Sequence, residues 1–136
     1  MQPSAILESA LYVTDLDAAE TFYRDVIGLE RIGKVDGRHV FFRCGRGVLL
    51  LFNAEVTKHQ PPPDARLPVP PHGTVGEGHL CFSATAEEIT QWKAVLEGRG
   101  IEIEADFEWP SGGRSIYFRD PSGNSIEFAE PKIWGF

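Results

Sequence analysis

The chain has 136 residues, of which 42% are hydrophobic, so it can bury one core and is too short for two ordinary domains. Its formal net charge of −7 at pH 7 argues against nucleic acid and anionic membranes as partners, because both are bound by clustered Lys and Arg. We therefore expect one domain over residues 1–136, with a small molecule as its partner.

The beginning of the sequence, MQPSAILESALYV, has no basic segment followed by a long apolar run, and no stretch of the chain has the length of a membrane span. We expect a cytoplasmic protein. The two cysteines, Cys44 and Cys81, lie far apart in strand-like runs and lack the spacing of a metal-binding pair. We interpret them as buried free thiols.

The first half of the sequence predicts a strand, an amphipathic helix and three further strands. The opening strand, ESALYVTD, carries Glu8 and leads to Asp15, a good N-cap for a helix with apolar residues at three- and four-residue spacing. Gly28 ends this helix. A tight turn at residues 44–47 joins the last two strands.

A proline-rich linker is predicted over residues 55–76. Proline fits neither a helix interior nor a central strand, and this segment holds six of the ten prolines of the chain. They are Pro61, Pro62, Pro63, Pro68, Pro70 and Pro71. Because the segment is longer than usual connections, two interpretations stand side by side, a mere spacer and a lid or partner arm.

The second half repeats the order of elements. HLCFSATA matches ESALYVTD and places His79 opposite Glu8, while Thr85 can cap a helix that ends near Gly98. RHVFFRCGRGVLLLF and RSIYFRDPSGNSIEF align without a gap. The repeat predicts two modules of a strand, a helix and three strands, residues 5–54 and 77–131, in an α+β fold.

The internal alignment also predicts a site with four corners, at Glu8 and His79 on the opening strands and at Leu51 and Glu127 on the closing strands. Three of these residues, all except the leucine, can bind a metal. Glu127 lies between Ile126 and an expected core phenylalanine, so its side chain points away from the core. The alternative for each of the three is an ordinary polar residue on an exposed strand face.

Three stretches, LYVTDLDAAETFYRDVIGLE, GEGHLCFSA and YFRDPSGNSIEFAEP, resemble the signature stretches of the vicinal oxygen chelate superfamily, which includes glyoxalases, bleomycin resistance proteins and extradiol dioxygenases. The resemblance implies paired βαβββ modules whose mixed sheets curl into a cup. It also implies a homodimer and one divalent metal (Zn, Mn, Ni, Fe or Mg) bound by Glu8, His79 and Glu127. The chain departs from the family pattern at Glu8, where His or Gln is common, and at Leu51. Tyr117 is similar to the tyrosine that contacts substrate in fosfomycin-resistance enzymes, although a core aromatic residue is an alternative.

The resemblance implies a metal-dependent enzyme that acts on a small molecule with adjacent oxygens by lyase, isomerase or transferase chemistry. Glu8 or Glu127 is the candidate base. Dioxygenase activity is less favoured, because Glu8 in place of an imidazole makes the ligand set harder than an oxygen-activating iron site requires. The alternative is a non-catalytic protein that binds small molecules, as bleomycin resistance proteins do.

Overall fold

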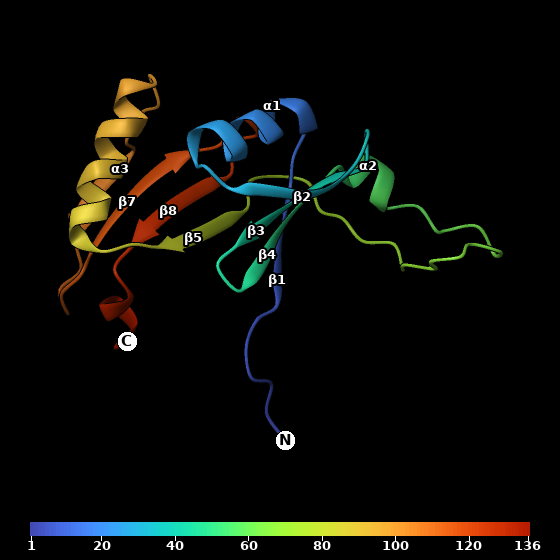
Figure 1. Cartoon of the computed structure of the whole chain (residues 1–136), viewed down its shortest axis with the longest axis horizontal. Helices are drawn as coiled ribbons and strands as arrows, with labels where there is room; N and C mark the ends of the chain where they lie inside the picture. The colour runs from blue at the N-terminus through green and yellow to red at the C-terminus, as the bar shows by residue number, and fades with distance from the viewer. The chain divides into compact units, whose positions relative to one another are not determined.

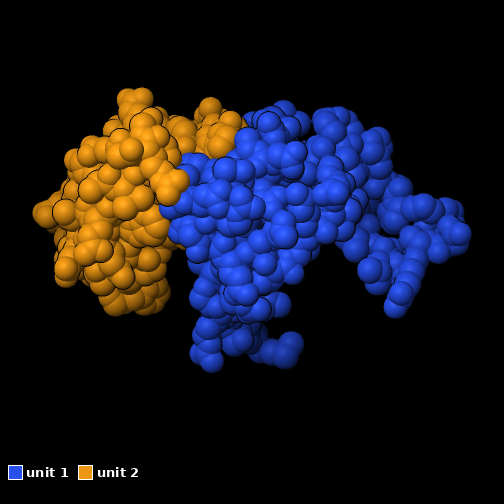
Figure 2. Space-filling model, turned by 45° about the horizontal axis from the view of Figure 1, so that its top comes forward, with its two compact units in different colours: residues 1–76 blue, residues 77–136 orange.

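The structure, a computed structural model, describes residues 1–136, which form two compact units, Met1–Gly76 and Glu77–Phe136 (Figure 2). Each unit holds a four-stranded mixed sheet with a helix packed on one face (Figure 1). No helix in either unit has the length and apolar character needed to cross a membrane.

The first unit follows the order β1 (Glu8–Tyr12), α1 (Leu16–Thr21), η1 (Phe22–Val26), β2 (Glu30–Val35), β3 (His39–Cys44), β4 (Gly47–Phe52) and α2 (Ala54–Thr57). Its strands lie in the order β1-β4-β3-β2, with β1 parallel to β4 and the other neighbours antiparallel. The short α2 was not predicted, since its four residues carry no helical pattern beyond the Asn53 N-cap.

The first helix forms as its sequence predicts. The Asp15 carboxylate accepts a hydrogen bond from the Ala18 amide at 3.0 Å and so caps α1. The last turn widens into the π-helical η1, where Phe22 and Tyr23 are buried. Tyr23 packs against Phe42 of β3, with ring centroids 6.2 Å apart, and this contact joins the helix to the sheet.

A buried carboxylate links α1 to β2. The Glu20 side chain is only 6% exposed, and it accepts hydrogen bonds from Arg31 and Lys34, each at 2.6 Å. The bond from Lys34, helped by the one from Arg31, lowers the pKa of Glu20 below its ordinary value against the opposing effect of burial. The ionised carboxylate therefore stabilises the folded first unit.

We expect Glu20→Gln to lower the free energy of unfolding at pH 7 by about 2 kcal/mol, because charge-assisted hydrogen bonds are lost from a buried acceptor. Since the folded-state pKa lies below the unfolded one, this contribution is present above the ordinary carboxyl pKa and is lost as the pH falls through the folded value. Urea unfolding of variant and wild type should thus converge in acid. Glu30→Gln, which removes an exposed ion pair to Arg43, is the matched control and should change little.

The second unit repeats this architecture with β5 (His79–Ser83), α3 (Ala86–Gly98), β6 (Ala105–Glu108), β7 (Arg114–Arg119), β8 (Ser125–Ala129) and a terminal 3-10 helix, η2 (Pro131–Trp134). Its strand order is β5-β8-β7-β6, with β5 parallel to β8. The predicted α+β fold of two βαβββ modules with mixed sheets is confirmed.

Helix α3 begins with a capping box, in which Thr85 and Glu88 exchange hydrogen bonds between side chain and backbone at 2.7 and 3.2 Å. Ile89 is fully buried, and Trp92 stacks on Phe128 of β8 with ring centroids 4.7 Å apart. These contacts fill one face of the second sheet and leave its other face open.

The expectation of two buried thiols was wrong. Both cysteines are free, but Cys44 is half-buried and Cys81 is exposed. Cys81 lies on β5 opposite Glu127 of β8, so it belongs to the face that α3 does not cover. Strand patterning alone did not distinguish the two faces at this position.

Candidate functional site

The face of the second sheet that α3 does not cover brings together three predicted site residues, two of the candidate metal ligands and the candidate substrate contact. His79 lies at the start of β5, Glu127 in the middle of β8 and Tyr117 opposite Glu127 on β7. Successive strand residues point to opposite faces, so Ile126 and Phe128 pack in the core while Glu127 points the other way. The three side chains therefore share one face of one sheet.

Glu127 is not an exposed strand acid. The residue is only 4% exposed, its Oε2 lies 3.3 Å from His79 Nε2, and its Oε1 is buried without a hydrogen-bond partner. A buried carboxylate oxygen without a donor is costly, because it has lost its water and gained nothing in return. The Oε1 atom is therefore the part of this carboxylate that a cation could satisfy.

His79 is oriented by the backbone of the neighbouring strand. Its Nδ1 lies 3.0 Å from the Ser125 carbonyl oxygen, which can only accept, so Nδ1 carries the hydrogen and donates it. The other ring nitrogen, Nε2, then faces the Glu127 carboxylate. Backbone fixation of one ring nitrogen is the arrangement that metal-binding histidines use to aim the other.

The turn between β7 and β8 holds this histidine in place. Asp120 Oδ1 accepts hydrogen bonds from the amides of Ser122 and Asn124, each at 2.9 Å. The buried Asn124 side chain in turn accepts a hydrogen bond from the Gly78 amide at 2.7 Å. The DPSGN sequence thus ties the start of β8 to the residue before His79.

Tyr117 lies beside the pair, and it is no core aromatic residue. Its ring stacks near His79, with centroids 6.2 Å apart, and near Phe107, at 5.9 Å. Burial, with the nearby Glu127 carboxylate, raises the pKa of Tyr117 to about 12. The phenol is therefore protonated at neutral pH and can donate a hydrogen bond.

Cys81 is a member of this face that the sequence reading missed. Although the residue as a whole is exposed, its sulfur is partly shielded from water. This shielding and the adjacent Glu127 carboxylate raise the pKa of the Cys81 thiol to about 12. A neutral thiol is a poor nucleophile, so we assign Cys81 no reaction of its own; its side chain packs beside the Glu127 carboxylate. Its register opposite Glu127 was the signal that could have found it.

Glu8 lies on the other unit, as the first residue of β1. Across the first sheet, Glu8 of β1 pairs with Val48 of β4, and Val48 pairs with Arg43 of β3. Across the second sheet, His79 of β5 pairs in the same way with Ser125 of β8, and Ser125 pairs with Arg119 of β7. Glu8 and His79 therefore occupy equivalent positions, and Glu8 lines a cavity on the open face of the first sheet. The placement of Glu8 beside His79 and Glu127 is a prediction.

The prediction that Leu51 is the residue of the first unit equivalent to Glu127 was wrong by one position. Arg43 pairs with Val48 across a turn of residues 44–47, whereas Arg119 pairs with Ser125 across the longer turn 120–124. The residue equivalent to Glu127 is therefore Leu50, which lies opposite Phe41 as Glu127 lies opposite Tyr117. Leu51 itself is fully buried in the core.

Comparison with known families decides the relationship. Residues 5–128 match the model of the Glyoxalase/Bleomycin resistance protein/Dioxygenase superfamily. The chain belongs to this superfamily. The family predicted from the three sequence stretches is thereby confirmed.

Within the superfamily, the chain is similar to a lactoylglutathione lyase from Agrobacterium tumefaciens, with 51% identity, 100% of each chain covered and a TM-score of 0.93. A virulence protein from Salmonella typhimurium is 27% identical over 96% of this chain and 98% of its own, with a TM-score of 0.67. A fosfomycin resistance protein from Listeria monocytogenes shares the fold, with 18% identity, coverage of 95% and 94%, and a TM-score of 0.68. The comparison with curated proteins found no match.

Members of the Glyoxalase/Bleomycin resistance protein/Dioxygenase superfamily are typically metal-dependent. In this chain, the Nε2 atom of His79, which the backbone contact at Nδ1 orients, and the unpartnered Oε1 of Glu127 fit a divalent cation. No group of three His, Cys, Asp or Glu side chains lies together in either unit. The second unit therefore offers two ligands, and a further ligand has to come from elsewhere.

Proposed function

We propose that this chain is a metal-dependent enzyme that acts on a small molecule with adjacent oxygens, with Glu8, His79 and Glu127 as ligands of one divalent metal. The observation that carries the proposal is the buried Glu127 carboxylate, whose Oε1 has no partner while its Oε2 faces His79 Nε2. A cation would satisfy both groups at once. Zn, Mn, Ni, Fe and Mg are the candidates, with the two carboxylates favouring the harder ones.

The chemistry that we propose is of the lyase or isomerase type. The neighbour at 51% identity is a lactoylglutathione lyase, and a lactoyl thioester carries a hydroxyl and a carbonyl on adjacent carbons. When bound, the metal would act as a Lewis acid on such oxygens. Glu8 or Glu127 would move a proton between the two carbons, and the protonated Tyr117 would donate a hydrogen bond to a developing oxyanion.

Leu50 limits this proposal to two possible bases. Because the position equivalent to Glu127 in the first unit is aliphatic, it supplies neither a ligand nor a base. The same feature favours a second candidate function, a protein that binds a small molecule without metal or turnover. Cytoplasmic location and a homodimer remain parts of the proposal.

The two candidates differ in metal content and turnover. The experiment is elemental analysis of the chain purified without chelators, followed by assay with lactoylglutathione before and after metal removal. We expect roughly one metal per chain and turnover that disappears with chelation and returns with the metal. A chain that takes up no metal even after reconstitution would be assigned to the binding class.

A further inference from the structure

The proline-rich segment folds onto its own unit. We call residues 58–72, between α2 and the end of the prolines, the arm. At its first end, the Thr57 amide donates to the Asn53 carbonyl at 3.1 Å, and at its last end, the His72 amide donates to the Thr57 carbonyl at 3.0 Å. Both ends of the arm are therefore fixed at one buried residue, Thr57.

Side chains hold the last end of the arm as well. The Tyr12 hydroxyl is hydrogen-bonded to His72 Nδ1 at 2.7 Å, and the His72 ring packs edge-on against Phe52 with centroids 4.6 Å apart. The six prolines fix their own φ angles and restrict the residues before them. The arm is thus a closed, stiffened loop anchored on β1 and β4, and it is more than a spacer.

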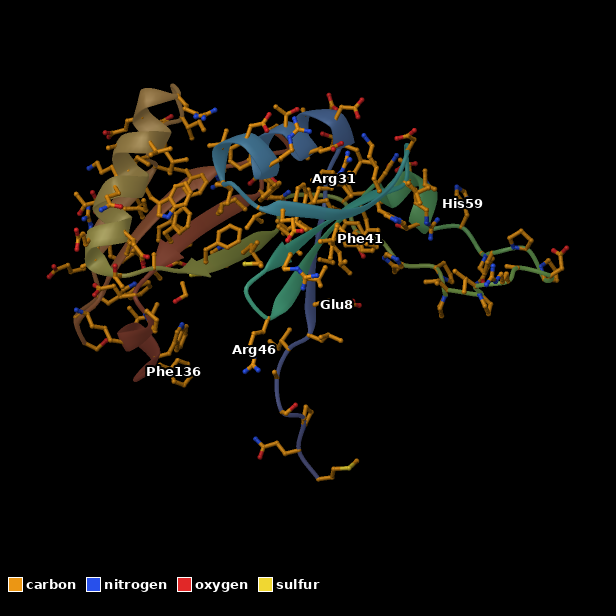
Figure 3. The ribbon with its side chains drawn as sticks, in the orientation of Figure 1. Glu8, Arg31, Phe41, Arg46, His59 and Phe136 are labelled. Atoms are coloured by element: carbon orange, nitrogen blue, oxygen red, sulfur yellow. The ribbon has the colours of Figure 1, made fainter.

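A cavity of about 840 Å³ lies between this arm and the open face of the first sheet. Its volume is in the range of pockets for small organic ligands. Figure 3 labels Phe41 on the sheet and His59 at the start of the arm, on its two sides. Apolar side chains from both sides dominate its lining: Ile32, Phe41, Leu50, Phe52, Leu67 and Val69.

The arm presents apolar side chains that nothing in the unit covers. Leu67 is 75% exposed and Val69 is 51% exposed, yet both line the cavity. Exposed apolar groups that converge on one concavity indicate a ligand site more than scattered surface residues do. His39 adds to this apolar wall, since its ring stacks on Phe41 with centroids 4.0 Å apart.

Two charged side chains line the cavity, the Glu8 carboxylate and the Arg38 guanidinium, and Arg38 is the cation that an acid group of a ligand would reach. Arg38 is half-buried and lines the cavity, and its guanidinium makes no ion pair and no hydrogen bond. Burial, and then the charge of Arg38, lower the pKa of His39, so that this ring is neutral at pH 7. An unpaired guanidinium beside an apolar wall recognises an acid group, which it can bind with two hydrogen bonds.

We propose that the cavity between the arm and the first sheet binds a small organic acid with an aromatic or branched apolar body, its acid group at Arg38. The volume and the lining select the body, and the unpaired guanidinium selects the acid. This site lies within the first unit and requires neither His79 nor Glu127. Because Glu8 and Leu50 also line this cavity, the inference rests on the proposed function and names the kind of substrate that its site would take. The probes below are titrated without metal, so a failure to bind them is distinguishable from a failure to bind metal.

The test uses two fluorescent probes with the same ring system, 1-anilinonaphthalene-8-sulfonate and N-phenyl-1-naphthylamine, which lacks the acid group. Both should bind the metal-free full-length chain at one saturable site. Arg38→Gln should weaken the sulfonate about tenfold and leave the neutral probe unchanged, because only the acid contact is lost. Leu67→Glu should weaken both probes, and because this side chain is largely exposed the fold should be retained.

Arg46→Gln is the matched control, since Arg46 is an exposed arginine of the same unit that does not line the cavity. It should leave both titrations unchanged. Equal loss of sulfonate binding in both arginine variants, or no effect of Arg38→Gln, would overturn the assignment of the acid contact. A wild-type chain that binds neither probe would overturn the proposal. If that chain is also a dimer in solution and Leu67→Glu makes it a monomer, the cavity is assigned to a second copy of the chain instead.

Discussion

Glu127→Gln is expected to lose metal affinity by at least about 100-fold, because substitutions around metal ligands already cost 10–100-fold and this one removes the ligand charge itself. The same change should raise the thermal stability of the metal-free chain. The change removes a buried carboxylate with an unpartnered Oε1, and the amide of the new side chain can keep a polar contact with His79 Nε2. Elemental analysis and thermal unfolding of the metal-free protein measure the two effects separately.

Glu108→Gln is the matched control, since Glu108 is an exposed acid on β6 of the same sheet. It should change neither metal content nor stability. Full metal content in Glu127→Gln would remove Glu127 from the ligand set. A clear loss of stability in the metal-free variant would instead mean that the carboxylate has a structural partner, contrary to the geometry of its Oε1.

Gly113→Ala should destabilise the second unit by about 2–4 kcal/mol, since both backbone strain and overlap oppose the new methyl group. Gly113 has φ of +99°, and a Cβ at this position would overlap Ile133 Cγ2 of η2. Either the turn before β7 or the terminal helix has to move. Urea unfolding gives the free-energy change directly.

Gly112→Ala separates the two causes. Gly112 has a similar φ of +94°, but its Cβ would meet nothing within 4 Å, so only the backbone cost of about 1 kcal/mol is expected. Ile133→Ala should rescue much of the loss in Gly113→Ala by removing the clashing atoms. Equal effects of the two glycine substitutions, or no rescue, would rule out the contact with η2 as the cause.

Most of the fold could be predicted from local signals in the sequence. Asp15 and Thr85 cap their helices as expected, because a side chain that satisfies helix amides acts within a few residues. The repeat then supplied the order of the strands in both units. The π-helical η1 and the short α2 could not be predicted, since tertiary packing decides the last turns of short helices.

The site was predictable where alternation determined it. Glu127 between two core residues had to face away from α3, and the structure places it beside His79. Its burial could not be read from the sequence, because it depends on neighbours from β5 and β7. The cavity of the first unit was also missed, since the fold of a proline-rich loop depends on contacts such as Tyr12 with His72, sixty residues apart.

The turn of residues 120–124 is one residue longer than the equivalent turn of residues 44–47, and this difference determines how the sequences of the two halves should be aligned. A shift of one residue in a strand moves every side chain to the other face. An alignment of the halves on their turn glycines therefore exchanges core and site positions beyond the turn, as it did for Leu51 and Leu50. Duplicated modules with turns of unequal length should be aligned on their paired strands, so that each site residue is matched to the structurally equivalent residue of the other module.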